Sequence, residues 1–171
     1  MEERKKKEKS ALTFIIALLS VVMGLVASVM IFLNPRSNTP AFPIFCISNI
    51  FESVAAGIIL AQLIPFYKIS KKMEARAGVS CPETRFILFN SIPLTAISVV
   101  LVEAVMCLLN IIMARSSIPA EQAPPFIAMY LSTYLPLIIP SVIICYVTAI
   151  LCSKLIYKMV GIKTPPKNNE A

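Results

Sequence analysis

Four long apolar stretches, separated by shorter polar segments, dominate the chain. They cover approximately residues 11–33, 44–67, 86–113 and 126–152. A helix of about 20 apolar residues, rising about 1.5 Å per residue, crosses a hydrocarbon layer about 30 Å thick. Because backbone N–H and C=O groups cannot be left without partners in lipid, each stretch must be helical. The pattern predicts an all-α integral membrane protein whose single domain, residues 11–160, is a four-helix bundle in the lipid bilayer.

The first stretch has the basic start of a secretory signal, but its length favours a retained helix. Its apolar run is about 23 residues long, whereas a signal core has about 7–15. The residues that follow, "NPRSNTPAFP" (34–43), contain no clear small-residue cleavage site.

The composition fits a membrane protein better than a nucleic-acid-binding protein. Hydrophobic residues make up 57% of the chain, against about 45–50% in soluble domains. The net charge of +7 invites a nucleic-acid partner. However, the basic residues cluster at the ends of the apolar stretches, without the aromatic or motif context of a nucleic-acid-binding fold. We therefore expect no nucleic-acid partner.

The basic residues are divided unequally between alternate polar segments, and this division predicts the orientation. The N-terminal tail 1–10 carries five, the middle connection five and the C-terminal end, which includes the tail 161–171, four. Each of the two other connections carries one. Lys and Arg near helix ends are retained on the inner side of the membrane. Because the N-terminal, middle and C-terminal segments carry fourteen of these residues and the two other connections carry two, we expect both termini in the cytoplasm.

The basic segments have two interpretations beyond topology. They can attract anionic lipid at the cytoplasmic face, which is worth about 1 kcal/mol per charge near the surface. They can instead form a docking site for a partner.

Short similar segments in the two halves of the sequence suggest that the chain contains an internal repeat. The segment "VMIFLN" (29–34) resembles "VMCLLN" (105–110), and "KISKKM" (68–73) resembles "KLIYKM" (154–159). The chain then reads as two helical hairpins in tandem. Since each hairpin has an even number of spans, both enter the membrane from the same side, as a parallel repeat about an axis along the membrane normal.

Two segments give the chain a resemblance to a known family. The first helix contains Met and Ser in "LLSVVMGLVASVMIFLN" (18–34), and the second ends with a proline followed by basic residues in "LIPFYKISKK" (63–72). In these features the chain resembles a bacterial family of membrane proteins, a domain of unknown function built from two-helix units that often occur in tandem. The resemblance covers most of residues 12–160 and implies a fold and a bacterial cytoplasmic membrane, but no activity. The second unit departs from it, because "ILCSKLIYKM" (150–159) lacks the proline.

Small residues form a stripe on each helix of the first hairpin. They recur at four-residue spacing and are Ser20, Gly24 and Ser28 in the first stretch and Ser53, Gly57 and Ala61 in the second. Helices in lipid associate through close packing and interhelical hydrogen bonds, because lipid tails are as apolar as Leu. We expect the two stripes to face each other, although small residues can also occur at this spacing by chance.

Three prolines, Pro93, Pro136 and Pro140, lie inside the third and fourth stretches. Each removes a backbone donor and clashes with the preceding turn, so we expect kinks there. Such a kink is a hinge, a break that coordinates a cation, or a static bend that fits the bundle.

Two carboxylates, Glu52 and Glu103, lie within apolar stretches at similar depth in the outer half of the membrane. Asn49 shares a helix face with Glu52, and Asn110 shares one with Glu103. No Lys, Arg or His lies at that depth to pair with an ionised acid. Both acids can be protonated and bonded to Asn49, Asn110 or Ser53, can share a proton, or can bind a cation. An acid inside a membrane is a candidate functional site, and the alternative is a neutral contact between helices.

The sequence favours neither enzymatic chemistry nor a cofactor. It has no His, and its five cysteines form no closely spaced pair for a metal. It contains no phosphate-binding loop, dinucleotide fingerprint or nucleophile elbow.

Two functions remain. The first is proton- or cation-coupled transport of a small solute, for which four helices are too few in a monomer and a homo-oligomer is expected. The second is a structural or accessory subunit that binds a partner or anionic lipid through its basic cytoplasmic surface.

Overall fold

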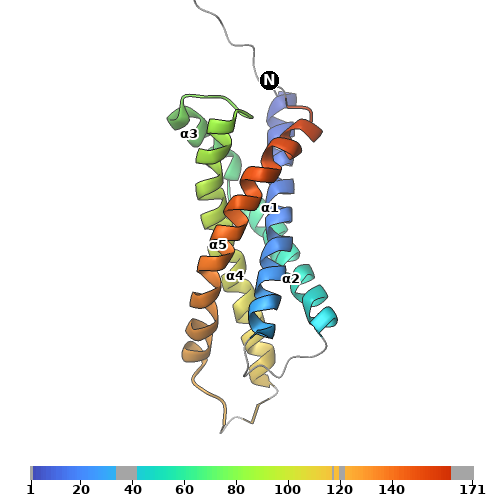
Figure 1. Ribbon diagram of the computed structural model, residues 1–171, viewed down its shortest axis with the longest axis vertical. Coiled ribbons are helices and arrows are strands. Elements are labelled where there is room, and N and C mark those ends of the chain that lie inside the picture. Colours follow the sequence, from blue (N-terminus) through green and yellow to red (C-terminus); the bar gives the residue numbers. More distant parts are fainter. Residues whose placement is uncertain (1, 34–41, 117, 120–121, 163–171) are drawn as a thin grey trace, which may run out of the picture.

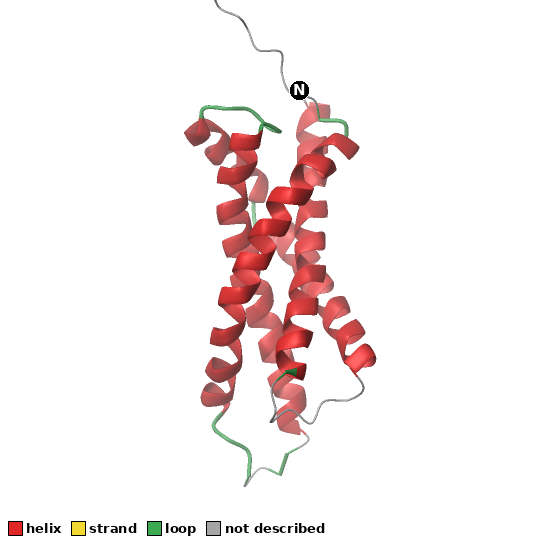
Figure 2. Cartoon of the chain, in the orientation of Figure 1, coloured by secondary structure: helices red, strands yellow, loops and turns green. Residues whose placement is uncertain are grey.

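The computed structural model describes residues 2–33, 42–116, 118–119 and 122–162. Within these residues the chain forms helices and no strands (Figure 2). The helices are α1 (Glu2–Phe32), α2 (Phe42–Leu63), α3 (Phe66–Ala77), α4 (Thr84–Ser116) and α5 (Phe126–Met159). All but α3 are long and apolar enough to cross a membrane. The predicted all-α architecture with four candidate spans is therefore confirmed.

The helix α1 begins well before the apolar stretch, at Glu2, so the basic segment 2–10 is helical. Lys and Glu favour helix intrinsically, and ion pairs four residues apart support it. Such pairs join Lys7 to Glu3 at 2.8 Å and Arg4 to Glu8 at 3.0 Å. Of the two predicted tails, residues 163–171 lie outside the described part of the chain.

The second apolar stretch does not form the uninterrupted helix predicted for residues 44–67. The helix α2 ends at Leu63, and α3 begins after Pro65. A proline disfavours helical geometry in the residue before it, here Ile64, and supplies no N–H for the helix. The short polar helix α3 was not predicted. It ends at Ala77 and is followed by Gly78, whose left-handed φ of 64° is the usual conformation after a helix end.

The three segments that are rich in Lys and Arg gather at one end of the bundle. Figure 1 shows that α1 begins, α3 lies and α5 ends at the same end, whereas α2 and α5 begin at the opposite one. We call the first the basic end, formed by residues 2–10, 66–83 and 154–162. The three segments are the ones in which the sequence concentrates Lys and Arg.

The interior and the outer surface both carry apolar side chains. Leu19 of α1, Val99 of α4 and Cys145 of α5 are completely buried in one core. On the outside, large apolar side chains such as Phe51 and Leu151 are 73% and 71% exposed. Such a surface suits a hydrocarbon solvent, in which outward apolar side chains cost nothing.

Candidate functional site

Two glycines bring α1 and α2 into backbone contact. A Cβ atom on Gly24 would lie 2.8 Å from Ile50 Cα and 2.9 Å from the carbonyl oxygen of Asn49, which is too close for any side chain. A Cβ atom on Gly57 would overlap the hydroxyl group of Ser20. The interface therefore requires the absence of side chains at both positions.

Short polar side chains cross the same interface. Ser53 donates a hydrogen bond to the carbonyl oxygen of Ser20 at 2.5 Å, and Asn49 Nδ2 donates to Ser28 Oγ at 3.0 Å. The structure thus places the stripes predicted on α1 and α2 at one interface. Ala61, the last member, is half-buried and packs against the hydrophobic core.

A chain of polar side chains continues from this interface to α4. Asn110 Nδ2 donates to Asn49 Oδ1 at 3.3 Å, while Asn49 bonds to Ser28 as above. Asn49 and Ser28 are only 1% and 0% exposed. Ser28, Asn49 and Asn110 therefore join three helices through side-chain hydrogen bonds inside the bundle.

Glu103 lies at the contact of α4 with α5 and is completely buried, with an exposed fraction of 0%. Its Oε1 accepts a hydrogen bond from Ser141 Oγ of α5 at 2.7 Å. Its Oε2 is also buried and has no hydrogen-bond partner. A buried polar atom of this kind calls for a proton, an ion or a water.

Glu52 has a different environment. It is half-buried, and its Oε1 accepts a hydrogen bond from Ser48 of the same helix at 3.0 Å. Its Oε2, like that of Glu103, is a buried atom without a hydrogen-bond partner. Asn49, although close in sequence, bonds instead to α1 and α4. Within the described residues no hydrogen bond joins Glu52 to Glu103, and neither acid bonds to Asn49, Asn110 or Ser53.

The sequence reasoning did not identify Ser48 and Ser141 as the partners of the two acids. Ser48 lies four residues before Glu52, so helical spacing could have indicated it. Ser141 lies on another helix, and no sequence spacing connects it with Glu103. Pro93, Pro136 and Pro140 all lie inside unbroken helices, and the kinks expected there stay a prediction.

A network of ion pairs at the basic end was also missed. Glu8 is only 5% exposed, and its two carboxylate oxygens pair with Arg4 at 3.0 Å and with Lys71 of α3 at 2.9 Å. Lys71 also pairs with Glu74 at 2.6 Å. Burial alone would lower the pKa of Lys71, but the hydrogen bonds that its ammonium group donates to Glu74 and Glu8, together with the negative charges of both carboxylates, outweigh burial and raise the pKa above its ordinary value.

The network fixes the loop between α3 and α4. Glu74 accepts a hydrogen bond from the Cys81 backbone N–H at 3.1 Å, and Arg4 donates one to the Cys81 carbonyl oxygen at 3.2 Å. Burial, reinforced by the negative charges of Glu8 and Glu74, raises the pKa of the Cys81 thiol to about 12. Arg4 and Glu8 thus attach the helical segment 2–10 to α3 and to this loop, while most of its other side chains are exposed.

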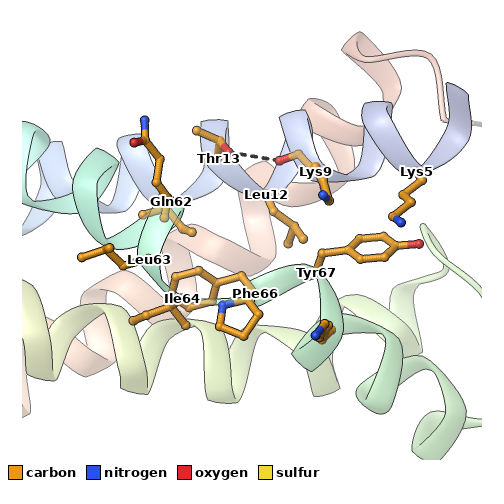
Figure 3. A pocket seen from close by; sticks show the side chains of 13 residues that line it. Lys5, Lys9, Leu12, Thr13, Gln62, Leu63, Ile64, Phe66 and Tyr67 are labelled. Carbon is orange, nitrogen blue, oxygen red and sulfur yellow. Dashed lines mark hydrogen bonds between the residues drawn. The ribbon is translucent and has the colours of Figure 1, made fainter. Parts of the chain in front are cut away.

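A groove of about 570 Å³ opens at the basic end between α1, the end of α2 and the start of α3 (Figure 3). Lys5 and Lys9 of α1 and Lys68 of α3 line its polar side. The ring of Tyr67 lies among lysines, with Lys5 Nζ at 5.9 Å and Lys9 Nζ at 6.0 Å from its centroid. The groove therefore combines clustered positive charge with an aromatic ring.

Comparison with protein-family models, with curated proteins and with solved structures found no match to this chain. The candidate sites are accordingly interpreted from their own chemistry.

Proposed function

We propose that the protein is a small multi-pass carrier in which Glu103 binds a proton or a monovalent cation that drives the movement of a small solute. One observation supports this above the others, namely that Glu103 is completely buried while its Oε2 has no hydrogen-bond partner. Acids inside membrane bundles are rare and mark proton or ion pathways. Glu52 also has a buried Oε2 without a partner, but it is less favoured because the residue as a whole is half-buried and, within the described residues, its hydrogen bond stays in its own helix.

The chemistry at Glu103 follows from its surroundings. An ionised carboxylate is costly to bury unless it is paired with a positive charge. Oε1 already accepts a hydrogen bond from Ser141, so Oε2 is the atom that would hold the proton or the cation. Loss of that proton or cation would leave a bare negative charge between α4 and α5. The two helices would then have to rearrange or admit water, and this change is the step that we propose to be coupled to the solute.

The proposed setting is the bacterial cytoplasmic membrane, with both termini in the cytoplasm. The excess of Lys and Arg in alternate segments supports this orientation, and so does the gathering of those segments at one end of the bundle (Figure 1). A homodimer or larger assembly would supply the further helices that a solute path needs. We also propose that the two hairpins form a tandem parallel repeat, which is supported by α1 and α4 both leading away from the basic end. Membership of the resembled bacterial family is a further proposal.

Flux measurements test the proposal. Purified protein in proteoliposomes, given a pH or sodium gradient, should produce proton or sodium flux that is coupled to candidate solutes. Glu103→Gln keeps the shape of the side chain but cannot become charged, and it should abolish this flux. Glu52→Gln is the matched control and should retain most of it. Equal flux in wild type and Glu103→Gln would exclude the proposed role of Glu103.

The basic end supports a second candidate function, a non-transporting accessory subunit that binds a partner or anionic lipid. Its helices and loop are fixed by the ion pairs of Glu8 and Glu74, so the lysines are presented on an ordered surface. This function predicts no flux in wild type. It also predicts that neutralising the exposed lysines removes a co-purifying partner or lipid.

A further inference from the structure

We propose that the groove at the basic end binds one anionic phospholipid of the inner leaflet. Lys5, Lys9 and Lys68 would surround the phosphate headgroup, and an acyl chain would follow the apolar wall of the groove. The proposal rests on the orientation given above and gives the second candidate function a site and a ligand. It does not depend on transport through Glu103.

The lysines of the groove carry charge that the protein itself does not neutralise. Within the described residues the ion pairs at the basic end involve Arg4, Lys7 and Lys71, and none joins Lys5, Lys9 or Lys68 to a carboxylate. Lys5 and Lys9 lie four residues apart on one face of α1, where like charges repel. A phosphate group between the lysines would offset this repulsion.

Tyr67 organises the positive charges. Three ammonium groups lie within about 6 Å of its ring centroid, the range of cation–π attraction, and belong to Lys5, Lys9 and Lys71. Figure 3 shows the Tyr67 side chain extending toward Lys5, with its hydroxyl group at the outer end. Tyr is enriched at membrane interfaces, and its hydroxyl group can donate a hydrogen bond to phosphate.

The apolar wall lies on the membrane side of the lysines. Leu12 and Ile16 follow Lys9 along α1 by roughly one and two turns and form the nearly buried floor of the groove. Leu63, 73% exposed, and the half-buried Ile64 form its accessible apolar wall at the α2–α3 junction. The opening exists because the chain leaves the helical path at Pro65. Polar and apolar walls therefore follow in the order of a phospholipid, with the headgroup outside and the acyl chain inside. A free phosphate ion would use the lysines but not this wall.

Native mass spectrometry of the full chain, released from nanodiscs that contain phosphatidylglycerol and phosphatidylcholine in equal amounts, tests the site. The wild-type protein should retain one phosphatidylglycerol molecule in preference to phosphatidylcholine. The combined variant Lys5→Gln, Lys9→Gln and Lys68→Gln should weaken this retention about 100-fold, given about 1 kcal/mol for each lysine near an anionic surface. The matched control removes the same charge outside the groove, with Lys6→Gln, Lys154→Gln and Lys158→Gln, and should keep the preference.

Several outcomes would overturn the proposal. Equal retention of the two lipids by wild type would show that there is no anionic site, and equal loss in both triple variants would show a dependence on net charge alone. Displacement of the lipid by millimolar inorganic phosphate would show a free anion site. Circular dichroism and gel filtration of the variants exclude misfolding as a cause. Glu103→Gln should keep the lipid preference while losing flux, so the two proposals can fail separately.

Discussion

The two hairpins of the bundle, α1–α2 and α4–α5, hold together in different ways. In the first, Gly24 and Gly57 allow the backbones to touch, and short hydroxyl and amide groups bond across the contact. The second has no glycine in either helix. There, large side chains reach across, with Tyr134 donating to the carbonyl oxygen of Val100 at 2.9 Å and Ser141 donating to Glu103 at 2.7 Å.

Because of this difference, the similar sequence segments of the two hairpins do not mean that the hairpins pack in the same way. A backbone contact depends on the absence of side chains, so it tolerates no enlargement. A contact made by long side chains tolerates small movements of the helices, because rotamers can adjust. The second hairpin, which contains Glu103 and two prolines, is therefore the half of the bundle better suited to a conformational change. The first is suited to act as the fixed half.

The largest expected effect concerns the loop that joins the hairpins. With its pKa raised to about 12 from the usual 9.0, Cys81 should react with a maleimide at pH 8 roughly 1000-fold more slowly than in the denatured chain, because only the thiolate attacks. Its rate should still rise about tenfold per pH unit above pH 9. Alkylation followed by peptide mass spectrometry separates Cys81 from the other cysteines. A rate that levels off near pH 9 would mean that the loop is not held against α1, and that the hairpins are joined flexibly.

The next effect tests the backbone contact of the first hairpin. Gly57→Leu must displace Ser20 and should lower the free energy of unfolding by about 1–3 kcal/mol, the usual cost of overpacking. The measurement is denaturant unfolding in detergent micelles. Ala55→Leu, at an exposed position of the same helix, adds similar apolar volume and should change stability little. Equal stability of the two variants would contradict the close contact of α1 with α2.

The comparison also shows what the sequence could and could not predict. Four membrane spans follow from the length of the apolar stretches, because lipid accepts only helices whose polar backbone is satisfied. The stripes through Gly24 and Gly57 could be found as well, since spacing within one helix defines a face. The end of α2 was missed because Ile64 and the residues around it are apolar and hide the effect of Pro65.

Contacts between helices could be predicted less well than faces of single helices. Helical spacing says that Glu103 and Asn110 share a face, but it does not say which residue of α2 or α5 lies opposite. The bonds from Asn110 to Asn49 and from Ser141 to Glu103 depend on how the helices are rotated and shifted against each other. That arrangement is fixed by packing over the entire bundle.

The smallest expected effect tests the second hairpin. Ser141→Ala removes the hydrogen bond to Glu103 Oε1 and leaves both carboxyl oxygens buried without a partner. Hydrogen bonds between membrane helices contribute about 0.6 kcal/mol on average and up to about 1.7 kcal/mol, so a loss in the upper part of this range is expected in the same unfolding measurement. Ser132→Ala is the control on the same helix, because Ser132 is exposed and, among the described residues, its hydroxyl group donates to the Met129 carbonyl oxygen of its own helix. If both variants were as stable as wild type, the Ser141–Glu103 bond would not hold α4 to α5. The second hairpin would then depend on its tyrosines and apolar packing, and Glu103 would be free to change its proton or cation without loosening the bundle.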